Sequence, residues 1–118
     1  MQVCRKDIII TYTLRCQDFQ ITDCTLDNIK EFTDMVVHDE EEYEFIVLSA
    51  SEEINGISFL QATRHKGDII FQAGIKIDGK PEVMETIVSK RKCYRFLRDY
   101  FLEGKTPDLT DFTLMKRM

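Results

Sequence analysis

Residues Tyr43–Val88 read YEFIVLSASEEINGISFLQATRHKGDIIFQAGIKIDGKPEVMETIV, and the rest of the predicted fold is built on this stretch. It contains four runs rich in apolar, β-branched and aromatic residues, and turn-forming residues separate each run from the next. This arrangement predicts four consecutive strands that pair as an antiparallel meander. The predicted strands are Tyr43–Ala50, Ile57–Arg64, Asp68–Asp78 and Glu82–Val88.

The three connections within this stretch have the composition of turns. They cover Ser51–Gly56, His65–Gly67 and Asp78–Pro81. The Asn-Gly pair of the first connection and the Asp-Gly pair of the third tolerate positive φ angles, and Pro81 fixes φ and has no amide donor. We therefore expect a turn at each connection.

Side chains alternate between two faces within the runs. Phe59, Gln61 and Thr63 point to one face, whereas Leu60 and Ala62 point to the other. The third run places five apolar residues on a single face, namely Ile69, Phe71, Ala73, Ile75 and Ile77. The sheet is therefore expected to pack under helices.

Two segments outside the meander predict these helices. Thr25 is a suitable N-cap for a helix over Leu26–Val37, where apolar residues recur close to the helical period. Ser89 is a suitable N-cap for a second helix over about residues 90–102, and Gly104 ends it. The apolar stripe of the second helix consists of Cys93, Phe96, Leu97, Tyr100 and Phe101.

The N-terminal region and the tail complete the predicted fold. Asp7–Arg15 is rich in β-branched residues and predicts a strand, and Phe19–Thr22 predicts a short strand that pairs back on it. In the tail, Leu109 and Phe112 are expected to lie against the core as a short extended piece. The sequence thus predicts a single α+β domain over residues 1–118, with one antiparallel sheet of five to six strands covered by two helices.

Composition and charge limit the classes of function. The chain has 118 residues, of which 43% are hydrophobic, enough for one core and one domain. Its net charge of −5 argues against binding to nucleic acid or to anionic membranes, because both need a positive field. No window approaches the roughly 20 apolar residues that span a bilayer. No signal-peptide pattern is present, so we expect a cytoplasmic protein.

The residues that could carry chemistry form no recognised motif. The four cysteines have no C-x-x-C or zinc-type spacing, so reduced thiols and no metal or cofactor are expected. His38 and His65 are the only histidines; the first ends the predicted first helix, and the second lies at a turn. Cys93, beside Lys92, is the one candidate nucleophile, and its place on the apolar stripe predicts burial. We therefore expect no catalytic residues.

An acidic run precedes the meander. His38–Glu44 carries five acids in seven residues, which fits a solvated loop that leads into an edge strand. It also fits a contact patch for a basic protein partner, which Asp34 would enlarge if the loops gather at one end of the sheet. The candidate partner-binding residues are Asp39, Glu40, Glu41, Glu42, Glu44, Glu52 and Glu53.

The second predicted helix has a basic outward face. Three of its cations lie in the first turn, where positive charge opposes the helix dipole. Water or a neighbouring acidic loop can offset this cost, and the alternative is a contact surface for an acidic protein or for phosphate. The cations are Lys90, Arg91, Lys92, Arg95 and Arg98.

Three segments carry a resemblance to a known family: Phe45-Ile46-Val47-Leu48, Phe59-Leu60-Gln61-Ala62 and Phe101–Leu109. They resemble small bacterial α+β proteins, among them the immunity proteins of polymorphic-toxin systems, in particular those associated with deaminase toxins. Members often carry a tryptophan near the C-terminal segment, where this chain has Phe112. The resemblance implies a protein that binds and blocks a toxin without a cofactor, and the acidity of the chain favours a basic toxin domain as the partner.

Two alternatives belong to other classes of function. One is a small-molecule-binding or enzymatic α+β domain with a pocket between sheet and helices, lined by Tyr12, His65 or Tyr94. The other is a structural homodimer that forms through edge strands or through a sheet face. A filled core favours the inhibitor over the enzyme, and a mass measurement in solution identifies the dimer.

Overall fold

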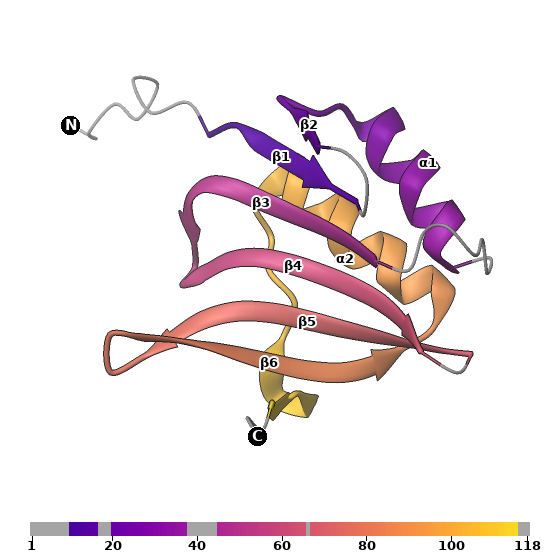
Figure 1. The fold of residues 1–118 in the computed structure, drawn as a ribbon. Helices are drawn as coiled ribbons and strands as arrows, with labels where there is room; N and C mark the ends of the chain where they lie inside the picture. Colours follow the sequence, from indigo (N-terminus) through magenta and orange to yellow (C-terminus); the bar gives the residue numbers. More distant parts are fainter. Residues whose placement is uncertain (1–9, 17–19, 38–44, 66, 116–118) are drawn as a thin grey trace.

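The computed structural model describes residues 10–16, 20–37, 45–65 and 67–115. Within these ranges, seven strands form one sheet in the order β2-β1-β3-β4-β5-β6-β7, and every neighbouring pair is antiparallel (Figure 1). The elements are β1 (Tyr12–Arg15), β2 (Gln20–Thr22), α1 (Leu26–Val37), β3 (Phe45–Ile54), β4 (Ile57–His65), β5 (Asp68–Ile77), β6 (Lys80–Val88), α2 (Lys90–Glu103), the 3-10 turn η1 (Leu109–Asp111) and β7 (Thr113–Leu114).

The α+β class and the single antiparallel sheet are confirmed, but the predicted number of five to six strands is wrong. The additional strand is β7, a two-residue segment that pairs with Met84 and Glu85 of β6. Two residues cannot display an alternating pattern, so only the register of the folded sheet reveals this strand. Phe112, directly before β7, is buried as expected, whereas half-buried Leu109 lies in a 3-10 turn and not in an extended piece.

The first connection of the meander is shorter than its composition suggests. Strand β3 continues through the predicted turn as far as Ile54, and its pairing with β4 shifts between Ser49 and Ile54. The turn itself consists of Asn55 and Gly56, whose φ angles are 51° and 81°. These residues adopt positive φ at low cost and close a tight hairpin. The expected loop residues Glu52 and Glu53 therefore lie on a strand.

Both helices begin directly after their predicted N-caps, and α2 ends at its predicted C-cap. At α1, the Thr25 hydroxyl accepts a hydrogen bond from the Asn28 amide at 3.2 Å, and the Asn28 side chain accepts one from the Thr25 amide at 2.9 Å. At α2, the Ser89 hydroxyl accepts a hydrogen bond from the Lys92 amide at 3.1 Å. Gly104 ends α2 with φ 64°, the left-handed conformation that favours glycine.

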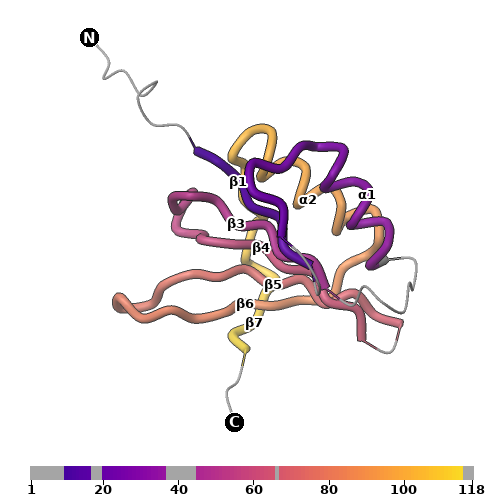
Figure 2. The backbone as a smooth tube through the Cα atoms, turned by 45° about the horizontal axis from the view of Figure 1, so that its top comes forward, coloured from indigo at the N-terminus to yellow at the C-terminus, as the bar shows by residue number. Residues whose placement is uncertain are grey.

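The two helices cover the same face of the sheet (Figures 1 and 2). Alternate residues of the four central strands meet them, and Leu60, Ala62 and Phe71 are fully buried there. Tyr100 of α2 is also fully buried, and its hydroxyl donates to the Ile57 carbonyl of β4 at 3.1 Å. This bond fixes the helix to the centre of the sheet and satisfies a hydroxyl that burial would otherwise leave unpaired.

The segment after α2 seals the rest of the covered face. It runs behind β4 and β5 on the side of the helices and emerges beyond β6 (Figure 1). Phe112 is 7% exposed, and its ring meets that of Phe71 edge-to-face at 6.5 Å between centroids. The layered core is therefore complete on one side of the sheet, while the other side carries no helix in the part of the chain that the structure describes.

Candidate interaction surface on the open sheet face

The structure describes two of the seven predicted partner-binding acids. Asp39, Glu40, Glu41, Glu42 and Glu44 lie outside the described residues. The other two are exposed at the end of β3, and the Glu53 carboxylate lies 3.2 Å from the Lys76 ammonium of β5.

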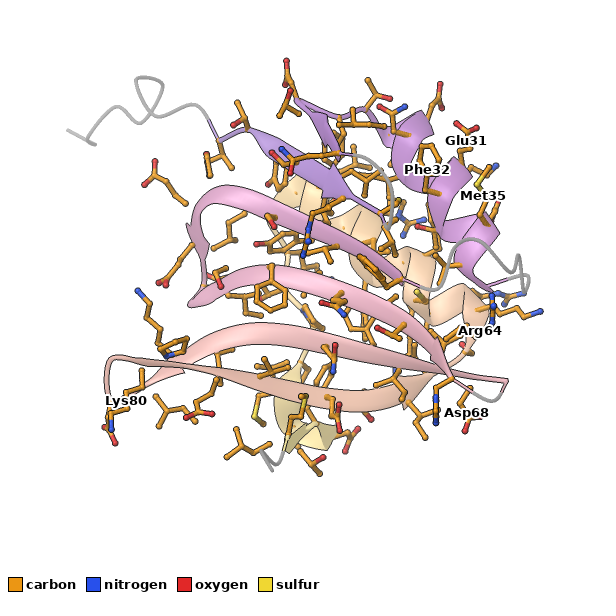
Figure 3. The ribbon with its side chains drawn as sticks, in the orientation of Figure 1. Glu31, Phe32, Met35, Arg64, Asp68 and Lys80 are labelled. Carbon is orange, nitrogen blue, oxygen red and sulfur yellow. The ribbon has the colours of Figure 1, made fainter. Side chains whose placement is uncertain are left out.

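Asp34 does not enlarge a patch around Glu52. The Arg64 guanidinium of β4 donates to the Val36 carbonyl at 2.8 Å, which fixes the C-terminal end of α1 beside one end of the sheet (Figure 3). Phe45 pairs with Thr63 at this same end. Seven residue steps along β3, about 23 Å at roughly 3.3 Å per residue, separate Phe45 from Glu52. Asp34 and Glu52 therefore lie at opposite ends of the sheet.

The side of the sheet that faces away from the helices, here called the open face, presents its side chains in transverse rows. Cross-strand register defines these rows, because directly paired residues point to the same side. The row through the middle of the sheet, here called the central row, consists of Arg15 (β1), Val47 (β3), Gln61 (β4), Gln72 (β5) and Glu85 (β6).

Apolar side chains flank the central row on both sides. One neighbouring row contains Phe45, Thr63, Ile70 and Ile87, and the other contains Thr13, Ser49, Phe59, Gly74 and Val83. Most of these side chains are half-buried, but Ile87 is 63% exposed. Within these three rows the charged residues are Arg15 and Glu85, which lie at opposite margins of the central row.

A shallow hollow of about 550 Å³ lies over the middle of the open face. The ring of Phe59 forms part of its wall by lying across the neighbouring strand at Gly74, where an added Cβ atom would overlap the ring. Glycine is therefore required at this position for the ring to lie flat on the sheet. The lining residues are Phe59, Gln61, Thr63, His65, Ile70, Gln72, Val83 and Met115.

Hydrogen bonds orient the two amides in the hollow. The Gln72 amide donates to the Glu85 carboxylate at 3.0 Å and lies 3.3 Å from the Met115 sulfur. The Gln61 amide donates to the Thr63 hydroxyl at 3.1 Å. Each of these amide donors therefore contacts an acceptor on the same face of the sheet.

The described cysteines are buried and unsuited to nucleophilic chemistry. Burial raises the pKa of the Cys93 thiol from 9.0 to about 12 and that of Cys16 to about 11. Burial also raises the pKa of Cys24, and the nearby Asp23 carboxylate adds to the effect. A thiol with a raised pKa carries almost no thiolate at neutral pH, and thiolate is the reactive form.

The three residues named as alternative lining of a pocket between sheet and helices lie in separate places. Tyr12 lies on the helix side of β1, where its hydroxyl donates to the Tyr100 carbonyl at 3.1 Å. Tyr94 lies on α2 beneath the Arg98 guanidinium, 5.9 Å from the ring centroid. His65 borders the hollow on the other side of the sheet. In the part of the chain that the structure describes, no three His, Cys, Asp or Glu side chains group as metal ligands would.

The basic surface of α2 is largely exposed, and within the described ranges one of its cations, Arg98, forms a salt bridge. Arg98 pairs with Asp99 at 3.0 Å, and the Lys92 ammonium lies 5.6 Å from the ring centroid of Phe96. Beside these residues, α2 and the following segment enclose a hollow of about 290 Å³ that contains both cations and carboxylates. Opposite charges in one small hollow give no net preference for an anion, so this surface is a weaker candidate than the open face.

Sequence reasoning missed the open face as a site, although its alternation was visible. The pattern already placed Phe59, Gln61 and Thr63 on the side opposite to Leu60. The missing information was the register, which brings side chains from five strands into one row.

Comparisons with protein-family models, curated proteins and solved structures give no match for this chain. Among the described residues, no helix combines the length and the apolar character that crossing a bilayer requires.

Proposed function

We propose that this chain is a non-catalytic protein-binding module that contacts its partner through the open face of the sheet. The proposal rests on the one-sided architecture: both helices and the segment from Lys105 to Phe112 cover one face, while the other presents apolar rows around a hollow that is lined by amides and by Met115. Protein contact sites combine such an apolar centre with a polar margin. The burial of Cys16, Cys24 and Cys93 supports a non-catalytic role.

Paired arginine substitutions on the two sides of the molecule test this proposal. Ile87 on the open face and Leu102 on α2 are 63% and 54% exposed, so an arginine at either site can reach solvent without disturbing the core. Ile87→Arg should weaken the affinity for the partner protein at least about tenfold, which corresponds to roughly 1.4 kcal/mol of binding free energy. Leu102→Arg should leave binding unchanged. Titration calorimetry measures both, and equal losses in the two variants would contradict a site on the open face.

The resemblance supplies a more specific candidate, an immunity-type inhibitor of a bacterial toxin. In this proposal the acids of 39–44, together with Glu52 and Glu53, attract a basic toxin surface, and charge complementarity mainly raises the association rate. If a gene beside the gene for this chain encodes a toxin, co-expression of this chain should protect cells from that toxin, and a lack of protection would contradict the inhibitor role. Reversal of Glu40, Glu41 and Glu42 to lysine should slow association at low salt, and an unchanged rate would exclude the acidic run as the contact.

A further inference from the structure

The central row spans the sheet and carries opposite charges at equal distances from its middle. Arg15 on β1 and Glu85 on β6 each lie two strands from Gln61 on β4. With neighbouring strands roughly 4.8 Å apart, each charge lies about 10 Å from the centre of the row. The two charged residues thus lie at matching positions on either side of β4 but have opposite signs. Two copies of this row can therefore face each other so that each arginine meets a glutamate.

We propose that the open face binds a second copy of this chain, with a two-fold axis that runs along β4. This axis places each strand of one copy opposite the strand of the second copy that lies at the same distance on the other side of β4. Strand β1 therefore faces β6 of the second copy, and β3 faces β5 of the second copy. Arg15 then faces Glu85 of the second copy, and the reciprocal pair forms at the other margin. This inference rests on the proposed function and names the occupant of the same surface.

The flanking rows are also self-complementary about this axis. Phe59 faces Phe59 of the second copy at the centre, and Phe45 faces Ile70 of the second copy. In the central row, Gln61 faces Gln61 of the second copy and Val47 faces Gln72. The contact near the axis therefore combines apolar groups with amides, while the charge pairs lie at the margins, and protein interfaces commonly contain both kinds of contact.

The other in-plane axis gives a poor interface. An axis perpendicular to the strands would place β1 over β1 and β6 over β6 of the second copy, so that Arg15 would face Arg15 and Glu85 would face Glu85. Like charges in contact are destabilising. The charges of the central row therefore select the axis along β4.

Distances between packed sheets allow the proposed charge pair. Face-to-face sheets pack about 10 Å apart, a gap that an arginine and a glutamate can bridge together. The Arg15 guanidinium already lies over the Phe45 ring, 5.9 Å from its centroid, and so is held above the open face. The Glu85 carboxylate accepts one hydrogen bond from Gln72 and keeps further acceptor positions for a second donor.

The edges of the sheet favour the face over edge-to-edge pairing as the dimer contact. The edge strands β2 and β7 contain three and two residues, and very short edge strands are a common protection against edge pairing. Along β6, the Val83 carbonyl already accepts a hydrogen bond from the Met115 amide at 2.8 Å. Pro81 on the same strand lacks an amide donor.

The size of the face predicts a weak dimer. Five strands at roughly 4.8 Å and about six residues at roughly 3.3 Å give a footprint of about 500 Å² per copy. The total of about 1,000 Å² is at the lower limit for specific interfaces. We therefore expect a monomer–dimer equilibrium that depends on concentration, with a dissociation constant on the order of micromolar.

Sedimentation of the full chain and of two charge-reversal variants tests the inference. Arg15→Glu and Glu85→Arg should each weaken self-association at least about tenfold, because each variant places two like-charged pairs in its homodimer. An equimolar mixture of the two variants should associate again, because both pairs in the mixed dimer are then oppositely charged. Circular dichroism confirms that each variant folds.

Two results would overturn the inference. One is a wild-type chain that stays monomeric up to millimolar concentration, and the other is a mixture that associates no better than its components. If the chain is monomeric but binds another protein, and Ile87→Arg abolishes that binding, then the second-copy inference alone fails. If that binding is also unaffected by Ile87→Arg, then the proposed function fails as well.

Discussion

At the scale of single residues, the described part of the core contains a polar group that has no hydrogen-bond partner among the described residues. Thr33 of α1 is fully buried, and among the described residues its hydroxyl has no hydrogen-bond partner. Most buried hydroxyls find an acceptor, as Tyr100 does at the Ile57 carbonyl. Thr33 therefore contributes its methyl group to packing, while its hydroxyl costs free energy.

Thr33→Val should stabilise the protein. Valine keeps the shape of threonine and removes the unpaired buried hydroxyl, which costs about 1–3 kcal/mol. The matched variant Thr33→Ala also removes the methyl group and leaves a small cavity, so its gain should be smaller or reversed. Urea unfolding measures both. A free energy of unfolding that falls in Thr33→Val would show that the hydroxyl does have a partner in the folded protein.

At the scale of elements, the helix caps follow from local sequence alone. Ser89 has a side-chain acceptor and precedes the apolar stripe, and both features can be identified from the sequence. In the structure, α2 ends within one residue of the predicted end. The first turn of α2 carries Lys90, Arg91 and Lys92, which oppose the helix dipole. The cap therefore stabilises a helix start that its neighbouring charges weaken.

Substitutions of Ser89 separate these two effects. Ser89→Ala should lower the free energy of unfolding by about 1 kcal/mol, because the Lys92 amide loses its acceptor. Ser89→Asp keeps an acceptor and adds a negative charge beside three cations, so it should match or exceed the wild-type stability. Thermal unfolding at low and high salt measures the difference, and an Asp variant less stable than the Ala variant would contradict this explanation of the cap.

Strand ends were harder to predict than helix ends. The run of Glu52 and Glu53 contains poor strand formers, so composition indicated a loop, but pairing across the Asn55-Gly56 turn extends β3 through it. In the same way, β6 begins at Lys80 and includes Pro81, because pairing with β5 continues to the turn. Cross-strand contacts decide these boundaries, and a local pattern does not contain them.

At the scale of the whole molecule, the sequence predicted the layers but not the surface that they leave free. The alternation in β4 and β5 and the two amphipathic stripes were sufficient to place the helices on one face. The relation between Arg15 and Glu85 was not predictable, because 70 positions and a five-strand register separate them. The residues of the central row, including the charges at its two ends, become neighbours only in the folded sheet.

In the proposed dimer, the open face packs against the open face of a second copy of this chain. Backbone amide NMR spectra, recorded as the protein is concentrated from micromolar to millimolar, test it most directly. We predict that concentration moves the amide signals of Phe59, Gln61, Ile70 and Gln72 while those of α2 stay fixed. Signals that move only on the helices, or that do not move at any concentration, would contradict the claim.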